Sequence, residues 1–238
     1  MPVWVPETTS TQDAVRTWAR ARRPAGSALV AEHQTEGRGR LGRSWVAPAG
    51  QAVLLSVLLR PQLPPDRLGL LPLAAAVGVR IATHGRLGIK WPNDLLAPDG
   101  RKVAGILAES EIEAGSVAWV VVGVGLNLRG VPAEVGTAAC LDELGPPLRK
   151  EDLAIDVLAS VQRWTALVET APERVLQAWR RGSVTLGRRV RVGAQTGVAE
   201  DVAPDGALWL RRDDGERTRV VAGDVEIEPS SWSEEPEA

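Results

Sequence analysis

Apolar residues recur along the first 182 positions with two periods, one typical of strands and one typical of helices. Continuous or alternating apolar runs predict strands over 3–7, 27–35, 52–60, 87–91, 103–112 and 116–128. Apolar residues three and four positions apart predict helices over 11–23, 68–85 and 150–181. Thr9 or Ser10 offers an N-cap for the first helix, and Pro72 lies near the first turns of the second. We therefore expect residues 1–182 to form one domain of alternating strands and helices.

The pattern changes at Gly187, after which short alternating segments are broken by glycines. These segments, 188–193, 195–203, 206–212 and 216–228, predict a small all-β unit. We place this second domain over residues 183–229. Residues 230–238 are acidic and rich in Pro and Ser, so we expect a disordered acidic tail there.

Composition excludes several classes of protein. The formal net charge is −2, so the chain has no overall positive field that would bind nucleic acid without sequence preference. Cys140 is the only cysteine, which excludes an internal disulfide and a cysteine-rich metal cluster. The N-terminus lacks the basic start and apolar segment of a secretory signal, and no apolar run is long enough to cross a bilayer. We therefore expect a cytoplasmic protein with no membrane partner.

Residues 36–45, EGRGRLGRSW, hold three arginines and three glycines, and we name them the arginine–glycine loop. Their spacing is one substitution away from a phosphate-binding P-loop, but Arg43 occupies the lysine position and no helix is predicted over 45–50. Arg38, Arg40 and Arg43 can instead donate forked hydrogen bonds to phosphate or carboxylate oxygens. Because close arginines repel and glycines are flexible, we expect a mobile loop in the absence of ligand. A solvated basic loop that binds no ligand is the alternative.

Polar groups also follow the strand predicted at 87–91. Lys90, Asn93 and Asp94 belong to the sequence KWPND, and this combination could hold a phosphate with its magnesium ion. The alternative is a Pro-Asn-Asp turn that forms for local hydrogen-bonding reasons. Lys102 begins the next buried strand, where burying a lysine is costly unless an anion is close.

Small residues characterise the end of the strand predicted at 116–128. Gly123 and Gly125 would permit a ligand to approach the backbone closely, and Asn127 could hydrogen-bond to an adenine edge. The spacing is not a dinucleotide-binding fingerprint, because Leu128 stands where the third glycine should be. A strand end with glycine bends is the alternative.

Five motifs, in this order, resemble those of the biotin protein ligases. They are Ser10-Thr11-Gln12, the segment from Gln34 to Trp45, Lys90-Trp91-Pro92-Asn93-Asp94, Lys102-Val103-Ala104-Gly105 and Gly123-x-Gly125-x-Asn127. The resemblance implies an α+β fold, with a mixed-sheet catalytic domain followed by a small C-terminal SH3-like β-barrel. It also implies that biotin and MgATP give biotinyl-5′-AMP and pyrophosphate, after which biotin passes to a lysine of a biotin carboxyl carrier domain.

The resemblance further implies roles for the matching residues. Biotin would bind at Ser10, Thr11, Gln12, Gln34, Gly37, Arg38, Gly39, Arg40, Trp45, Lys102 and Gly105. ATP and the adenylate would bind at Arg38, Arg40, Arg43, Lys90, Asn93, Lys102, Gly125 and Asn127. Lys102, Arg40 and Asp94 would be catalytic, and Asn93 with Asp94 would hold magnesium. A cation at Lys102 would lower the repulsion between the biotin carboxylate and the α-phosphate, and Asp94 could accept or orient the proton of the acceptor lysine.

Two departures from the family pattern limit what the resemblance implies. Ala52 and Leu54 stand where family members often carry Asn and an aromatic residue, so the wall of the biotin pocket is left undetermined. Many bacterial relatives begin with a helix-turn-helix, whereas the ligase motifs begin here within ten residues of Met1. We therefore expect a ligase without repressor function and without a DNA partner, and a homodimer is left open.

Two other functions compete with biotin ligation. A lipoate or octanoate ligase or transferase would share the catalytic fold, although we do not expect it to carry this loop together with Lys102-Val103-Ala104-Gly105. A nucleic-acid-binding module could use the arginine–glycine loop. Single-strand binders usually interleave aromatic and basic residues, and only Trp45 lies near these arginines in the sequence.

Overall fold

The larger part of the molecule is built on a seven-stranded mixed sheet with the order β1-β2-β3-β7-β6-β5-β4. The structure is a computed structural model, and it describes residues 1–131 and 136–228. The strands are β1 (Val3–Thr8), β2 (Ala28–Gln34), β3 (Ala52–Leu59), β4 (Gly88–Lys90), β5 (Asp94–Leu96), β6 (Lys102–Glu113) and β7 (Ser116–Asn127). β1 pairs with β2 in parallel and the other neighbours are antiparallel, which confirms the predicted mixed sheet.

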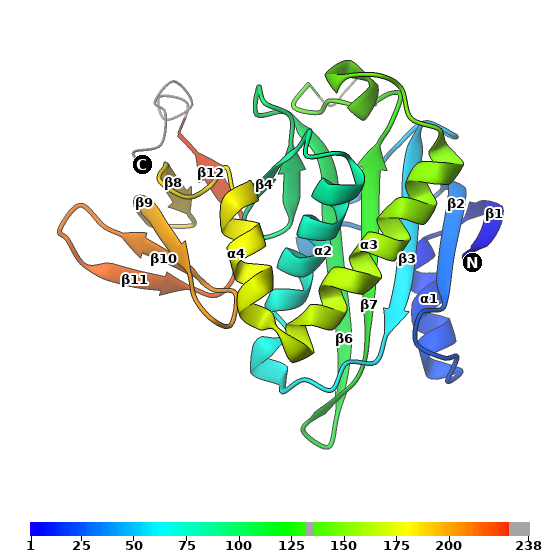
Figure 1. Ribbon diagram of the computed structural model, residues 1–238, viewed down its shortest axis with the longest axis horizontal. Helices are drawn as coiled ribbons and strands as arrows, with labels where there is room; N and C mark the ends of the chain where they lie inside the picture. Colours follow the sequence, from blue (N-terminus) through cyan, green and yellow to red (C-terminus); the bar gives the residue numbers. More distant parts are fainter. Residues whose placement is uncertain (132–135, 229–238) are drawn as a thin grey trace.

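Helices cover both faces of this sheet. They are α1 (Thr11–Arg20), α2 (Leu70–Ala82), α3 (Lys150–Thr170) and α4 (Pro172–Gly182), with short 3-10 turns at Arg40–Gly42, Pro65–Arg67 and Leu141–Leu144. Figure 1 shows α2 and α3 side by side across one face. α1 covers the other face, where it packs against β3 and β7. The apolar run of β3 serves both faces, because Leu55 and Val57 belong to the core under α2 and α3 whereas Leu58 belongs to the core under α1.

The chain then forms a separate five-stranded antiparallel sheet with the order β11-β10-β9-β8-β12. Its strands are β8 (Arg189–Val192), β9 (Gln195–Val202), β10 (Leu208–Arg211), β11 (Arg217–Val220) and β12 (Val225–Ile227). Alternate side chains such as Val190, Ala199 and Leu208 are buried inside it. This sheet is the small C-terminal SH3-like unit that the resemblance implies.

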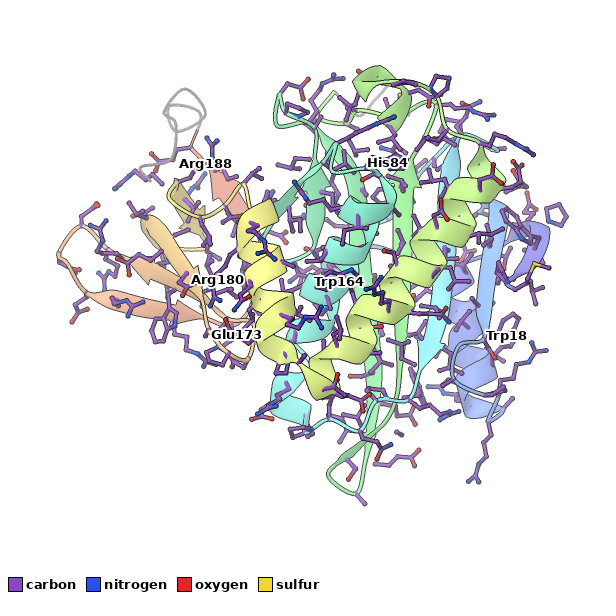
Figure 2. The ribbon with its side chains drawn as sticks, viewed as in Figure 1. Trp18, His84, Trp164, Glu173, Arg180 and Arg188 are labelled. Atoms are coloured by element: carbon purple, nitrogen blue, oxygen red, sulfur yellow. The ribbon has the colours of Figure 1, made fainter. Side chains whose placement is uncertain are left out.

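The two sheets share a continuous apolar core. Trp91 is buried between them, its indole Nε1–H donates to the Gly206 carbonyl at 2.9 Å, and its backbone N–H donates to Thr185 Oγ1 at 2.9 Å. Figure 2 shows Arg180 on α4 directed towards the small sheet, where its Nε donates to Asp201 Oδ1 at 2.7 Å. Because these bonds hold one unit against the other from several directions, the small sheet has a defined position beside the large one.

The helical region predicted over 150–181, with its two periodic segments, forms two helices, because the chain leaves helical geometry at Ala171 and Pro172 starts the second helix. Two other elements differ from the sequence prediction. The segment predicted over 216–228 divides into β11 and β12, which lie at opposite edges of the small sheet. The turn-rich sequence after Trp91 contains the short strand β5, which has too few residues for a recognisable alternation. The predicted acidic tail, residues 230–238, lies outside the described residues.

Replacing Trp91 by Ala should lower the free energy of unfolding by about 3–5 kcal/mol, because a fully buried aromatic side chain would leave a cavity and a lost hydrogen bond between the sheets. Urea denaturation measures this change. Trp4→Ala is the matched control, since Trp4 is exposed and should cost about 1 kcal/mol or less. Equal losses in the two variants would contradict the role of Trp91 as the joint between the sheets.

Candidate functional site

A narrow cavity lies where the start of α1, the arginine–glycine loop and the middle of the large sheet meet. Most of the predicted ligand-binding residues line it: Ser10, Thr11, Gln12, Gln34, Arg38, Gly39, Arg40, Trp45, Asn93, Lys102, Gly105 and Gly125. Leu55, Ser56, Ile106, Leu107, Gly123 and Val124 complete the lining. The free volume is about 50 Å³, whereas ligand pockets usually measure about 300–1,000 Å³. The loop therefore closes over the cavity in this structure.

One side of the cavity is a chain of buried hydrogen bonds. Thr11 donates to Gln34 Oε1 from its backbone N–H at 2.8 Å and from its hydroxyl at 3.0 Å. The hydroxyls of Thr11 and Ser56 lie 2.8 Å apart, and Ser56 Oγ also donates to Gln12 Oε1 at 3.2 Å. Ser10 Oγ is buried next to this chain and has no protein partner. A buried hydroxyl without a partner is costly, so a ligand that hydrogen-bonds to it would be favoured here.

The base of the arginine–glycine loop is fixed by a tryptophan that lies on bare backbone. Gly105 of β6 pairs with Gly125 of β7, and the Trp45 ring covers both residues. A Cβ at Gly125 would lie 2.4 Å from Trp45 Cε2, and a Cβ at Gly37 would lie 2.2 Å from the Trp45 carbonyl oxygen. The Trp45 side chain also packs against the cluster of Ala47, Ala52 and Leu54. These glycines are therefore required for close packing, and residues 52 and 54 form part of the same wall.

Two lysines share one carboxylate beside the cavity. The hairpin of β4 and β5 places Lys90 opposite Asp94, and β5 pairs with the start of β6 at Lys102. Lys102 Nζ lies 2.6 Å from Asp94 Oδ1, and Lys90 Nζ lies 3.9 Å from Asp94 Oδ2. Burial lowers the pKa of Lys90 from its ordinary value, although the Asp94 carboxylate opposes this shift. The arrangement holds the Lys102 ammonium at the cavity wall.

Each arginine of the loop has an acidic partner. Arg38 binds Asp13 and Glu109, with contacts of 2.7 Å to each. Arg40 Nη1 donates to Asn93 Oδ1 at 2.7 Å and lies 3.5 Å from Asp224, which also binds Arg43 at 2.7 Å.

We expected repulsion among the arginines to leave the loop mobile, but these carboxylates offset that repulsion. Glu109, Asp13 and Asp224 were not found from the sequence, because nothing in the local pattern marks them as partners of the loop.

A second cavity opens on the far side of Trp45 and Lys102, where Asn127 ends β7. It is lined by Ser44, Trp45, Val46, Lys102, Asn127, Thr137 and Ala138. Asn127 Nδ2 donates to the Ala139 carbonyl at 3.1 Å, whereas its buried Oδ1 has no protein partner. Oδ1 is therefore free to accept a hydrogen bond from a ligand amine. Lys102 and Trp45 line both cavities, so the two cavities adjoin at these side chains.

The geometry agrees with the comparisons to known proteins. Residues 4–127 match the biotin/lipoate A/B protein ligase family, and residues 185–227 match the biotin protein ligase C-terminal domain. The chain belongs to the biotin/lipoate A/B protein ligase family.

Among family members, the biotin–[acetyl-CoA-carboxylase] ligase of Mycobacterium tuberculosis is 41% identical over 217 residues, covering 84% of this chain and 78% of the relative. The enzyme of the same name from Paracoccus denitrificans is 38% identical and covers 84% and 90% of the two chains. The biotin protein ligase of Aquifex aeolicus, solved with biotin and ATP, has a TM-score of 0.76 at 26% identity, covering 95% and 98% of the chains.

Five predicted residues do not line the first cavity. Gly37, Arg43, Lys90, Asp94 and Asn127 are in this group, and Asn127 lines the second cavity. Ser56 is a lining residue that the sequence analysis missed, although it is the only polar residue in the strand AVLLSVLL. Asp224 gives no such signal, because it reaches the loop from the small sheet.

The predicted magnesium ligands are already engaged. Asn93 Oδ1 accepts from Arg40 and Asn93 Nδ2 donates to the Ile106 carbonyl at 2.9 Å, while Asp94 lies between two lysines. Among the described residues no group of three or more His, Cys, Asp or Glu side chains could hold a metal ion. Magnesium ligation by Asn93 and Asp94 stays a prediction.

Replacing Lys90 by Met should raise the free energy of unfolding at neutral pH. The lowered pKa means that the unfolded chain binds the proton of Lys90 more tightly, so the stability of the wild type should rise as the pH increases towards 10.5, the ordinary lysine value. The variant should lose this rise. Denaturant titrations across the alkaline range measure it, with Arg101→Met as an exposed control that keeps the wild-type slope. A steeper slope in Lys90→Met would contradict the prediction.

Proposed function

We propose that this chain is a biotin protein ligase, which joins biotin to ATP and then passes the biotinyl group to a lysine of a biotin carboxyl carrier domain. The observation that carries the proposal is the position of Lys102 between a cavity rich in hydrogen-bonding groups and a cavity that ends at Asn127. The first suits the ureido ring of biotin, and the second suits adenine. The two reacting anions, carboxylate and α-phosphate, then meet at the ammonium.

The first step joins two negatively charged groups. A carboxylate oxygen of biotin attacks the α-phosphorus of ATP, the new P–O bond forms, and the bond to the β-phosphate breaks with release of pyrophosphate. Lys102 offsets the repulsion between the reactants and the charge that gathers during the attack. Asp94 holds Lys102 in place through its 2.6 Å contact. Arg38, Arg40 and Arg43 surround the product as the loop covers it.

The second step uses a nucleophile that the acceptor supplies. The uncharged amine of its lysine attacks the carbonyl carbon of the mixed anhydride, a C–N bond forms, and AMP leaves with the bonding electrons. The amine loses one proton to its surroundings. Both Asp94 oxygens contact ammonium groups. Asp94 is therefore better placed to orient Lys102 than to accept this proton. Exclusion of water by the closed loop would protect the anhydride until the acceptor arrives.

The family also includes lipoate ligases, and the polar wall of the first cavity separates the two substrates. Ser10 presents a buried hydroxyl without a protein partner beside the Thr11–Gln34 pair, and a ureido ring can satisfy this hydroxyl whereas an octanoyl or lipoyl tail cannot. Sites of this kind reject analogues that leave such groups unpaired. The relatives named after acetyl-CoA-carboxylase support a carboxyl carrier domain as the acceptor.

The division into domains, the absence of a repressor role, the cellular location and the oligomeric state are also proposals. We infer that residues 1–182 catalyse and that residues 183–229 form the accessory domain, since the two sheets divide at this point. A ligase without a repressor role and without a DNA partner is consistent with arginines that are bound to carboxylates of the same chain. None of the described helices is long and apolar enough to cross a membrane. A cytoplasmic location and a homodimer both stay as expectations.

Exchange of labelled pyrophosphate into ATP should require biotin and should not proceed with octanoate or lipoate at equal concentration. The expected preference is about 10⁴-fold, the usual discrimination of a site whose hydrogen-bonding groups would be left unpaired. The acid-dependent exchange rate is the measurement. Exchange that is equally fast with octanoate would support the lipoate or octanoate alternative instead.

Replacing Lys102 by Ala should reduce this exchange by about a hundredfold or more, because the cation shared by the two anions is lost. Arg101→Ala removes a neighbouring exposed cation and serves as the control that keeps the wild-type rate. Thermal unfolding establishes that both variants are folded. A folded Lys102→Ala protein with the wild-type exchange rate would contradict the proposed mechanism.

A further inference from the structure

The carboxylate of Asp224 comes from the small sheet and yet lies at the tip of the arginine–glycine loop. It directly precedes β12, whose first residue Val225 is buried and pairs with Val192 of β8. Gly223 has a φ of 141°, and a Cβ there would lie 2.6 Å from Val192 Cγ1. The chain can make this tight passage only with glycine, and the passage fixes the direction in which Asp224 points.

Asp224 bridges two arginines of the loop with its two oxygens. Oδ2 lies 2.7 Å from Arg43 Nη2, and Oδ1 lies 3.5 Å from Arg40 Nη1. Arg43 is 71% exposed, so its bond to Asp224 is a contact at the outer surface of the loop, whereas Arg40 lies deeper at 24%. The two bonds therefore join the small domain to both the outer and the inner side of the loop.

The small domain cannot follow the loop when the loop moves. Trp91 and Arg180 hold the small sheet against the catalytic domain through Gly206 and Asp201. The cavity under the loop has a free volume of about 50 Å³, well below the volume of about 300–1,000 Å³ that is usual for ligand pockets. The loop must therefore move to admit substrates, and this movement must break its bonds to Asp224.

We propose that Asp224 is a positioning residue of the small domain, which latches the arginine–glycine loop over the active site through Arg43 and Arg40. The proposal rests on the proposed function, because the latch matters for retention of the reactive adenylate. An ion pair that is partly exposed contributes little energy, so substrates can still open the loop. Its loss should change the closed population by about twofold to fivefold. The latch thus gives the small domain a part in the reaction without any contact with the reacting atoms.

The test compares Asp224→Asn with Asp224→Glu and with the control Asp213→Asn, which removes an exposed carboxylate of the same domain that binds Arg189. One measurement is the rate at which trypsin cleaves after Arg38, Arg40 and Arg43 in the ligand-free protein. The other is the amount of biotin transferred to a bystander protein relative to a carboxyl carrier domain. Both should rise about twofold to fivefold in Asp224→Asn, stay near wild type in Asp224→Glu, and be unchanged in the control.

A second variant distinguishes the latch from a general weakening of the small domain. Arg43→Gln removes the same ion pair from the loop side at an exposed position, and trypsin cleavage is then compared at Arg38 and Arg40 alone. Adding Asp224→Asn to Arg43→Gln should then have a smaller effect than in the wild type, because one of the two bonds is already lost. A full additional effect, or wild-type cleavage and transfer in Asp224→Asn, would overturn the latch.

Different results would refute the proposed function and the latch. Absence of biotin-dependent pyrophosphate exchange in the wild type would refute the ligase assignment, whereas trypsin cleavage needs no ligand and tests the loop directly. If Asp224 instead competes with the phosphates for the arginines, Asp224→Asn would bind MgATP more tightly and lose less biotin to bystanders. That result would also overturn the latch.

Discussion

The geometry of the site depends on the bare backbone at Gly105 and Gly125. These residues face each other on β6 and β7, and Trp45 occupies the space that their side chains would fill. Trp45 also donates its backbone N–H to the Gly37 carbonyl at 2.8 Å, which closes the arginine–glycine loop at its base. The Lys102 ammonium lies 5.6 Å from the centroid of the Trp45 ring. The glycines at 105 and 125 thus allow Trp45 to hold the loop beside the Lys102 ammonium.

Charge balance sets how firmly the loop closes over that base. Its three arginines meet carboxylates from three separate elements, namely Asp13 of α1, Glu109 of β6 and Asp224 before β12. All three carboxylates are partly exposed to solvent, so each bond is weak compared with the phosphates of a bound nucleotide. A loop held by several weak bonds can close without a ligand and still open for one. A single strong buried pair would not permit both.

The elements and most of the site follow from the sequence, whereas the relations between distant segments do not. The long apolar run of β3 and the helical period of α2 predict their elements, because each pattern is local. β5 is only three residues long and gains its stability from strands on both sides, which no local pattern reveals. Asp224 is missed for the same reason, since its partners lie about 180 residues earlier.

The unpaired polar atoms of the site also lower the stability of the folded protein. Three buried polar atoms around the two cavities, Ser10 Oγ, Trp45 Nε1 and Asn127 Oδ1, have no protein partner. Each such atom disfavours the folded state by about 1–3 kcal/mol until a ligand or water satisfies it. An apolar substitution at these positions would relieve the cost and remove a ligand contact at the same time. The continuous core around Trp91 supplies the stability that lets the ligand-free protein keep these atoms unpaired. The packing between the two sheets therefore supports the chemistry of the site through the free energy of folding.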